Sequence, residues 1–403
     1  MAEHSATSSA PPRDVVVLAG VRTAIGKYGG GLKDVPPADL AAQVTREAVA
    51  RAGVEAHDVG HVVFGNVIHT ERRDMYMARA AAINAGLPVE IPALTVNRLC
   101  GSGLQAIVSA AQTIALGEAD VAVAGGAESM SRAQYWLPEL RWGQRMGDGG
   151  AIDVMVAALT DPFDDCHMGV TAENIAEKWS ITREDQDALA LQSHQRAAAA
   201  IAEGRFADQI LPIEIKGRKG TTVVAQDEHV RGDITLEDLA RLRPAFSKEG
   251  TVTAGNASGV NDAAAAVVLA DGDTARAKGL TSMGRLVAYS HVGVEPRFMG
   301  IGPVPAVQSV LAKAGLALSD IDVIEVNEAF AAQALAVVRD LDLPEEKTNP
   351  NGSGVGLGHP IGATGTILTV KALYELARTG GRYALVTMCI GGGQGIAAIF
   401  ERA

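Results

Sequence analysis

The sequence predicts an α/β fold built from two similar halves, and three observations support this prediction. Of the 403 residues, 47% are hydrophobic, 20% are charged and 45 are glycines, a composition typical of a globular α/β protein rich in small side chains. Strand-like and helix-like segments alternate along the chain, which favours a parallel or mixed sheet covered by helices. Similar segments also recur about 250 to 265 residues apart, which indicates a duplicated domain because this interval is far longer than a solenoid repeat.

The first third of the chain shows the strand and helix alternation directly. The β-branched run 15–19 predicts a buried strand that ends at a glycine-containing loop, residues 38–52 have helical spacing, and residues 61–64 open a second strand. Residues 93–96 predict a third strand. A helix should follow it, because apolar residues then recur at helical spacing: Leu104, Ile107, Val108, Ala111 and Ile114.

Three pairs of segments, in the same order in both halves, indicate the duplication. The first pair is Ala52-Gly53 with Asp58 and Asn66, against Ala314-Gly315 with Asp320 and Asn327. The other two pairs are Asn97-Arg-Leu-Cys-Gly-Ser-Gly103 with Asn349-Pro-Asn-Gly-Ser-Gly354, and Ala119-Asp-Val-Ala-Val-Ala-Gly-Gly126 with Gly381-Arg-Tyr-Ala-Leu-Val-Thr-Met-Cys-Ile-Gly-Gly-Gly393.

A long segment between the halves breaks the alternation. We expect within it a turn at Asp161-Pro162, an irregular loop at 163–169, a helix at 183–203 and a hairpin at 213–224. The predicted domains are a tail at 1–13, an N-terminal half at 14–129 plus 260–281, an inserted loop domain at 130–259, and a C-terminal half at 282–403.

Charge and cysteine content exclude several classes of function. The formal charge of −12, from 47 acidic and 35 basic residues, opposes binding to nucleic acid or to an anionic membrane. Three cysteines without a CxxC pair indicate free thiols in a reducing compartment, with no zinc ribbon and no expected metal site. The tail lacks the apolar core of a signal peptide, and no apolar stretch approaches the roughly 20 residues of a membrane helix. We therefore expect a cytoplasmic protein.

Cys100 is the first candidate for chemistry. It lies between a predicted strand and a predicted helix, within Asn97-Arg-Leu-Cys-Gly-Ser-Gly103. A helix N-terminus and an adjacent cation lower the pKa of a cysteine, and glycines on either side of Ser102 let a substrate carbonyl approach the backbone. The alternative is an inert buried cysteine.

Two glycine-rich segments near the C-terminus carry the next candidates. His359 lies within Gly356-Leu-Gly-His-Pro-Ile-Gly-Ala-Thr-Gly365, where a following proline restricts it and the glycines give it little to pack against. Cys389 ends a predicted buried strand and precedes Gly391-Gly-Gly-Gln-Gly395, whose backbone N–H groups can stabilise an oxyanion. The alternatives are an ordinary surface or core histidine and a tight turn between strands.

A fourth candidate is Asn327-Glu328, two polar residues at the end of an apolar strand. Their side chains can orient a water or a carbonyl group, and the alternative is a helix cap. A dinucleotide-binding loop fits none of these glycine runs, because neither run near the C-terminus matches G-x-G-x-x-G followed by a helix and a distal acid.

Together these four segments resemble the signature segments of the thiolase family, in the same order, from about residue 14 to the C-terminus. The resemblance implies a duplicated, five-layered α/β/α/β/α fold. It also implies that Cys100 is the acyl-carrying nucleophile, that His359 is the base activating it, and that Cys389 is the acid and base at the substrate α-carbon. Asn327 would hold a water that, with His359, faces one thioester oxygen, and the N–H groups of Cys100 and Gly391 would form the second oxyanion hole.

The same resemblance implies coenzyme A thioesters as substrates, with no permanently bound cofactor. Positions matching the coenzyme A and pantetheine path of biosynthetic thiolases are His167, Met168, Arg231, Ser258, Ala329 and Phe330. Arg231, and the basic turn Lys216, Arg218 and Lys219, would give a negatively charged protein a local patch for an anionic ligand; a solvated hairpin tip is the alternative for that turn. Cys166 receives no family role.

A closer likeness is to the broad-range biosynthetic β-ketothiolases of bacteria that make polyhydroxyalkanoates, through Asp74-Met-Tyr76, 349–354 and 388–395. The expected reaction is the reversible Claisen condensation of acetyl-CoA with acetyl-CoA or another short acyl-CoA. Residues 129–150 resemble the projecting loop through which biosynthetic thiolases form homotetramers, although their aromatics and arginines also suit a dimer rim. Two other functions remain: a decarboxylating ketoacyl synthase, which normally lacks the second cysteine, and a non-catalytic acyl-CoA or lipid carrier.

Overall fold

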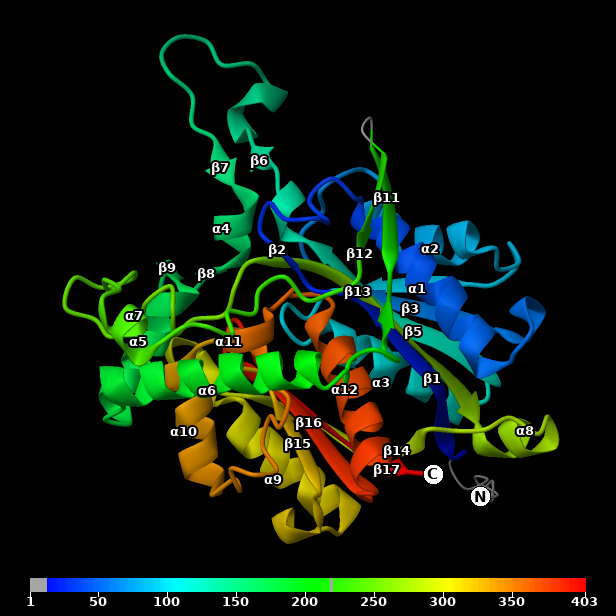
Figure 1. Ribbon diagram of the computed structural model, residues 1–403. Helices are drawn as coiled ribbons and strands as arrows, with labels where there is room; N and C mark the ends of the chain where they lie inside the picture. The colour runs from blue at the N-terminus through cyan, green and yellow to red at the C-terminus, as the bar shows by residue number, and fades with distance from the viewer. Residues whose placement is uncertain (1–12, 218–219) are drawn as a thin grey trace, which may run out of the picture.

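The computed structural model describes residues 13–217 and 220–403 (Figure 1). The predicted tail therefore lies almost wholly outside the described residues, as do Arg218 and Lys219 of the basic turn. No helix among the described residues is long and apolar enough to cross a membrane.

The N-terminal half is a mixed sheet with helices on both faces. Its strands run in the order β4-β3-β5-β13-β1, and they are β1 (Val15–Thr23), β3 (His61–Gly65), β4 (Ala93–Val96), β5 (Val121–Ser129) and β13 (Asn261–Asp271). Its main helices are α1 (Pro37–Ala52), α2 (Met77–Ala85) and α3 (Ser102–Ala115).

The C-terminal half repeats this plan. Its strands run in the order β15-β16-β17-β14, and they are β14 (Gly284–Gly293), β15 (Val323–Val326), β16 (Tyr383–Ile390) and β17 (Gln394–Arg402). Its main helices are α9 (Pro303–Ala314), α10 (Ala331–Leu341) and α12 (Thr364–Thr379).

The strand pairing confirms that the halves are duplicates. In each half a parallel pair, β3/β5 or β15/β16, is followed by two antiparallel pairs. Even β4 has a counterpart, since a single parallel bridge joins Ile324 to Thr348 beside β15. Because Gly65 lies opposite Gly126 and Val326 lies opposite Thr387, the register makes Asn66 equivalent to Asn327 and Glu128 equivalent to Cys389.

Three buried clusters separate five layers, as the family resemblance implies. The first packs α1 and α2 on one face of the N-terminal strands, and the second encloses α3 and α12 between the two sheets. The third packs α9 and α10 on the outer face of the C-terminal strands. The two sheets are joined at one edge, where β1 and β14 share two residue pairs.

The inserted segment forms most of the remaining elements. It contains β6 (Tyr135–Trp136), β7 (Ile152–Asp153), α4 (Val154–Ala158), β8 (Thr160–Asp161), β9 (Cys166–His167), α5 (Met168–Lys178), α6 (Arg183–Ala202), β10 (Ile210–Leu211), β11 (Ile213–Gly217), β12 (Gly220–Val224) and α7 (Leu236–Ala240). The other short elements are β2 (Gly26–Lys27), α8 (Gly272–Ala277), α11 (Gly354–Leu357) and 3-10 turns at Ala56–Asp58, Asp74–Tyr76, Met130–Arg132, Pro138–Arg141, Pro296–Ile301 and Leu318–Asp320.

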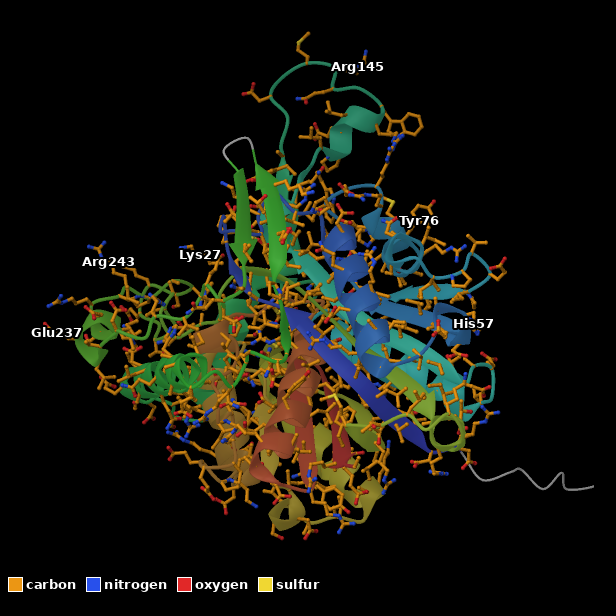
Figure 2. All side chains as sticks on the ribbon, turned by 45° about the vertical axis from the view of Figure 1, so that its right-hand side comes forward. Lys27, His57, Tyr76, Arg145, Glu237 and Arg243 are labelled. Carbon is orange, nitrogen blue, oxygen red and sulfur yellow. The ribbon has the colours of Figure 1, made fainter. Side chains whose placement is uncertain are left out.

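An arm made of β6, β7 and the residues between them stands clear of the body in Figure 1, and Figure 2 shows Arg145 near its tip. Its apolar side chains are open to solvent: Trp142 is 92% and Met146 97% exposed. The predicted helix at 183–203 and hairpin at 213–224 are both confirmed. The predicted domain boundaries stay a prediction.

Two local predictions were wrong. The first strand does not end before Gly20 but continues to Thr23, because residues 19–22 keep pairing with β13 after a shift of register. The buried Arg22 is also paired with Asp227 at 2.7 Å. Residues 163–169 are not an irregular loop throughout. A turn ends at β9, and Met168 begins α5, where the His167 ring nitrogen Nδ1 accepts the Gly169 N–H at 3.0 Å.

Candidate active site

The nucleophile candidate lies in a strained loop between β4 and α3. Leu99 has a left-handed φ of 44°, which an L-residue adopts only at a cost, and the Asn97 side chain holds its N–H at 2.9 Å. The Ser102 hydroxyl fixes the same turn by donating to Leu99 O at 2.7 Å. The loop thus presents Cys100 one residue before the N-cap, Gly101.

The expectation that the helix N-terminus lowers the pKa of Cys100 was wrong. Burial raises the pKa of its thiol to about 11, and the Gly391 N–H that hydrogen-bonds the sulfur only partly opposes this rise. Removing the thiolate from water therefore outweighs the hydrogen bonds that stabilise it. Cys100 consequently rests as a thiol and needs a base to become a nucleophile.

His359 has the protonation state that a base needs. It is only 5% exposed, and burial lowers its pKa to about 4, so the imidazole is neutral near pH 7. Its Nδ1 lies 2.6 Å from Thr364 Oγ1, whose single proton is donated to Pro360 O at 2.9 Å. Nδ1 must therefore carry the ring proton, which leaves a free lone pair on Nε2.

Asn327 follows β15 and faces the free nitrogen of His359. Its amide Nδ2 lies 3.4 Å from His359 Nε2, and its backbone N–H donates to Thr387 O at 3.0 Å. Its Oδ1 is buried and has no hydrogen-bond partner among the described residues. This oxygen is an acceptor that a ligand or a water can use.

Cys389 and the glycines after it complete the convergence. Cys389 is fully buried in β16, and burial together with the nearby Cys100 raises the pKa of its thiol. A Cβ at Gly391 would lie 2.8 Å from Met168 Cε, so a side chain there would displace the end of Met168. Positive φ angles at Gly392 (79°) and Gly393 (83°) then turn the chain into β17.

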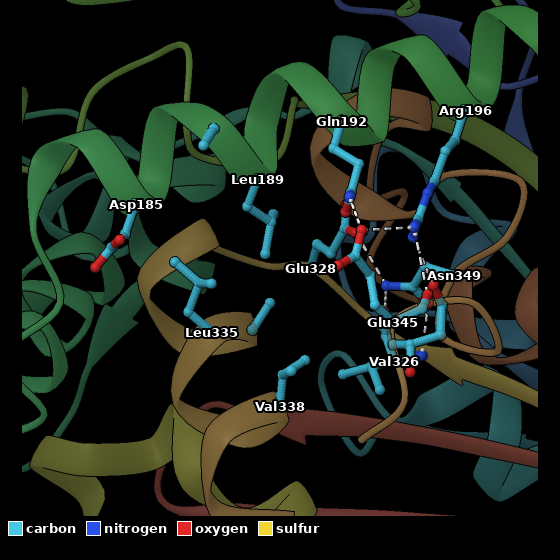
Figure 3. Close-up of a pocket in the computed structure, with 13 residues that line it drawn as sticks. Asp185, Leu189, Gln192, Arg196, Val326, Glu328, Leu335, Val338, Glu345 and Asn349 are labelled. Carbon is cyan, nitrogen blue, oxygen red and sulfur yellow. Dashed lines mark hydrogen bonds and ion pairs between the residues drawn. The ribbon is translucent and has the colours of Figure 1, made fainter. Parts of the chain in front are cut away.

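Glu328 has a structural role that the sequence did not reveal. Instead of facing a substrate, its buried carboxylate accepts hydrogen bonds from Ser193 Oγ at 2.6 Å, Asn349 Nδ2 at 2.9 Å and the Val355 N–H at 3.2 Å. Figure 3 shows a cavity of about 300 Å³ that reaches Glu328 and Asn349 from between α6 and α10. None of the four predicted catalytic side chains lines this cavity.

A second cavity, of about 530 Å³, contains His359. Three of the predicted coenzyme A residues, His167, Ser258 and Phe330, line the same cavity. Two others, Met168 and Ala329, pack with Cys389 and Phe330 in one buried cluster. The cavity therefore brings His359 together with three of the predicted coenzyme A residues, whereas Cys100, Asn327 and Cys389 do not line it.

The walls of this cavity are mainly apolar and aromatic. The Phe246 ring stacks on His167 with 4.7 Å between centroids and meets Phe330 edge-on at 6.0 Å. Arg231 does not line the cavity; it is exposed and lies close enough to lower the pKa of His229, which does. No local sequence pattern marks Phe246 or His229, because their places depend on packing.

Comparison with known proteins gives one consistent family. Residues 15–273 match the thiolase N-terminal domain and residues 280–402 match the thiolase C-terminal domain. Beta-ketothiolase BktB of Cupriavidus necator is 66% identical over 97% of this chain and 99% of its own length. The mitochondrial 3-ketoacyl-CoA thiolase of Homo sapiens is 47% identical over 96% of this chain and 98% of its own length.

Solved structures agree with these relatives. The crystal structure of the Bacillus anthracis acetyl-CoA acetyltransferase superposes with a TM-score of 0.96 at 50% identity, covering 97% of this chain and 99% of that one. Human mitochondrial 3-ketoacyl-CoA thiolase in complex with CoA superposes with a TM-score of 0.94 at 47% identity, covering 97% of this chain and 98% of that one.

Proposed function

The chain belongs to the thiolase family, and from this premise we propose that it is a β-ketothiolase. It is an acyltransferase that condenses acetyl-CoA with acetyl-CoA or another short acyl-CoA, giving a 3-ketoacyl-CoA and free CoA, and that catalyses the reverse thiolysis. The observation that carries this proposal is the 66% identity to a β-ketothiolase over nearly the full chain.

The first half-reaction is acyl transfer to Cys100. The neutral imidazole of His359 takes the thiol proton at Nε2, because Nδ1 already carries a proton held by Thr364. The thiolate attacks the thioester carbonyl, the C–S bond to CoA breaks, and the departing sulfur receives a proton from Cys389. The raised pKa keeps the Cys389 thiol protonated at rest, so its proton is present when the CoA sulfur departs.

The second half-reaction is carbon–carbon bond formation. Cys389, now a thiolate, removes a proton from the α-carbon of a second acetyl-CoA. The enolate oxygen faces protonated His359 and a water on Asn327, and the carbanion attacks the acyl carbon on Cys100. The N–H groups of Cys100 and Gly391 receive the oxyanion, and the Gly391 N–H already points at the Cys100 sulfur. Loss of the Cys100 thiolate then releases the 3-ketoacyl-CoA.

We assign coenzyme A recognition to the cavity that contains His359. Because His167 Nδ1 accepts the Gly169 N–H, the neutral ring carries its proton on Nε2 and can donate to a pantetheine carbonyl. Ser258 and Phe330 offer a hydroxyl and an apolar wall, with Met168 and Ala329 behind them. Arg231 supplies an exposed cation for the phosphates at the cavity mouth, which a chain of formal charge −12 needs locally.

Three further assignments belong to this proposal. The exposed aromatic and apolar arm would assemble a homotetramer, because single subunits rarely leave side chains such as Trp142 open to solvent. Free cysteines at 100, 166 and 389 suit the cytoplasm. A broad-range enzyme of this kind would supply precursors of polyhydroxyalkanoates. The mass of the assembled particle in solution, measured for the wild type and for Trp142→Ser, tests whether the arm forms a tetramer.

The central test is a mass measurement of the acyl-enzyme. Incubation with acetyl-CoA should add one acetyl group to the wild type, located on Cys100 by peptide mapping. Cys166→Ser serves as the matched control and should keep the adduct. A thiolysis series over 3-ketoacyl-CoA chain lengths then defines the range, with activity expected on both acetoacetyl-CoA and 3-ketovaleryl-CoA. An adduct that persists in Cys100→Ser as a thioester, or no thiolysis at any chain length, would overturn the proposal.

A further inference from the structure

Glu128 is a buried carboxylate that the proposed chemistry does not use. It lies at the end of β5, is 0% exposed, and no ion pair to it is present among the described residues. Its two oxygens accept four N–H groups: Ile68 N at 3.0 Å and Asn66 Nδ2 at 3.2 Å on Oε1, Val67 N at 3.2 Å and Gly362 N at 2.9 Å on Oε2. A carboxylate without a cation is costly to bury, and these donors offset that cost.

One of the four donors comes from the other half of the molecule. Gly362 lies three residues after His359, in the turn that leads into α12, whereas Glu128 and its other three partners belong to the N-terminal half. The carboxylate therefore holds the loop that carries His359 against the half that carries Cys100.

The backbone carbonyl group of Gly362 is held by close packing. A Cβ at Gly65 would lie 2.9 Å from Gly362 O, one at Gly103 would lie 3.1 Å from it, and one at Gly126 would collide with it. Three glycines of the N-terminal half thus leave a pit that this carbonyl oxygen enters, together with Ser102 beside Gly65 and Thr366 beside Gly103. The Glu128 carboxylate accepts a hydrogen bond from the Gly362 N–H, and the Gly362 carbonyl oxygen packs against the three glycines. We call this pair of contacts the grip on Gly362.

The imidazole of His359 is otherwise fixed from its own half and from β13. Its ring touches Thr364 and Asn327, both in the C-terminal half, and its backbone N–H donates to Asn261 Oδ1 at 2.9 Å. These contacts set the orientation of the ring. Gly362 connects the loop to the segment after Cys100 through Gly103, and the neighbouring Ile361 packs with Cys100 in one buried cluster.

We infer that Glu128 is a positioning residue: its carboxylate, with the glycine pit at Gly65, Gly103 and Gly126, holds the Gly362 peptide so that His359 stays in reach of the Cys100 thiol. This inference rests on the proposed function, because it assigns a support to the base of that same reaction. The register adds a reason for its place, since Glu128 occupies in the N-terminal half the position that Cys389 occupies in the C-terminal half.

The hydrogen-bond geometry around Glu128 favours its ionised form, whereas burial favours the protonated form. Burial raises the pKa of the carboxyl to about 8, and the N–H donors oppose that rise. All four contacts are donors, so a carboxyl proton would find no acceptor among them. Glutamine at this position would turn an NH₂ group toward two N–H groups and release part of the grip.

The test measures how strongly His359 activates Cys100 in Glu128→Gln and Glu128→Asp. Alkylation of Cys100 by iodoacetamide near neutral pH, followed by peptide mass in a Cys166→Ser background, reports the activation without requiring turnover. The alkylation rate in His359→Ala, which lacks the base, gives the lower limit for the activation of Cys100. Asp271→Asn is the matched control, because Asp271 is also a buried carboxylate of the N-terminal half but lies at the far end of the 11-residue strand that begins at Asn261. Parallel assays give kcat and KM for thiolysis of acetoacetyl-CoA.

We expect Glu128→Gln to slow alkylation and to lower kcat by about 10²-fold, since a shift of about 1 Å in a catalytic group has an effect of this size. The KM for CoA should stay within about twofold, because the coenzyme A residues are untouched. Glu128→Asp keeps the charge and should recover part of the alkylation rate. Asp271→Asn should match the wild type in both assays.

A wild-type alkylation rate and kcat in folded Glu128→Gln would overturn the inference, as would a loss confined to KM. If Glu128→Gln does not fold, Gly126→Ala tests the same grip by pushing on Gly362 O, and unchanged Cys100 reactivity in that variant would overturn it. Absence of thiolysis by the wild-type protein is a different result: it contradicts the proposed function, while the alkylation series still decides whether Glu128 positions His359.

Discussion

The two halves of the molecule share one backbone plan but use the same strand ends differently. In the N-terminal half, Asn66 donates to Ala127 O at 2.9 Å and to Glu128, whose carboxylate is surrounded by N–H donors. In the C-terminal half, the equivalent Asn327 faces a histidine base, and the equivalent of Glu128 is the thiol of Cys389. At the end of β5 the Glu128 carboxylate is fully hydrogen-bonded. At the end of β16 Cys389 instead belongs to an apolar cluster that shares Phe330 with a cavity.

The difference between Glu128 and Cys389 shows how two duplicated halves can acquire different functions. The register places both side-chain pairs identically, so the backbone alone does not decide which end reacts. A carboxylate at position 128 needs several donors to be buried, and collecting them ties loops of both halves together. A thiol at position 389 needs no such donors and can remain poised for proton transfer. Five experiments test this asymmetry between the two halves.

The largest effect is expected where the N-terminal half contributes to chemistry. Cys100→Ala removes the nucleophile and should abolish the acetyl adduct and lower kcat for thiolysis by at least about 10⁴-fold. Intact-mass analysis and steady-state assays measure both. Unchanged binding of CoA in the variant serves as the folding control. Substantial turnover in Cys100→Ala would show that the nucleophile does not come from the N-terminal half.

Cys389→Ala should separate the two half-reactions. The nucleophile, His359 and the Gly391 N–H remain, so Cys100 should still be acetylated, though more slowly. Carbanion formation loses its base, which is worth about 10²–10⁴-fold, and acetyl-enzyme should accumulate. Mass detection of the adduct and exchange of acetyl-CoA methyl protons into deuterated water measure the two steps. Exchange and condensation at wild-type rates would show that another group is the α-carbon base.

The equivalent asparagines offer a direct comparison of the two halves. Asn327→Ala should lower kcat by about 10²-fold, because a group facing the enolate oxygen is lost. Asn66→Ala should instead lower the free energy of unfolding by about 1–3 kcal/mol, because it leaves Ala127 O and Glu128 short of a donor. Urea unfolding and kcat are measured on both variants. The comparison fails if Asn66→Ala reduces kcat more than Asn327→Ala does.

The pH dependence of acylation should report the buried base of the C-terminal half. Burial lowers the pKa of His359 to about 4, so its free Nε2 persists well below the usual histidine pKa of about 6.5. The associated stability is fully present above about pH 6.5 and is lost as the pH falls toward about 4, because the unfolded chain then binds a proton that the folded histidine does not. Cys100 acetylation rates between these limits test this. An acid limb centred near 6.5 would contradict it.

The smallest effect is expected for Arg231, an exposed residue of the inserted segment that lies outside the ends of β5 and β16. Arg231→Ala should raise the KM for CoA by about two- to fivefold, since an exposed ion pair contributes at most about 1 kcal/mol. The difference from the wild type should shrink as salt concentration rises. Arg243→Ala, an exposed arginine labelled in Figure 2, is the control and should leave the KM unchanged. Equal effects of the two variants would mean general charge attraction instead of a specific contact.

Sequence reasoning identified the elements of the fold because their signals are local. β-branched runs predicted β1 and β3, helical spacing predicted α3 and α6, and three segment pairs predicted the duplication that the register confirms. The length of β1 was missed because it depends on backbone pairing with β13, a strand far along the chain. The hairpin β8/β9 was missed because its strands have two residues each, too few for a period.

By itself the sequence determined the reactive residue types: two cysteines, a histidine and an asparagine, each in a segment with family-specific neighbours. Only the tertiary structure decided their states. Burial makes Cys100 a thiol and His359 a neutral base, Thr364 selects the ring nitrogen that is free, and Glu128 reaches Gly362 across 234 positions of the chain. Desolvation and long-range hydrogen bonds sum over groups brought together by folding, and no local pattern of residues encodes that sum.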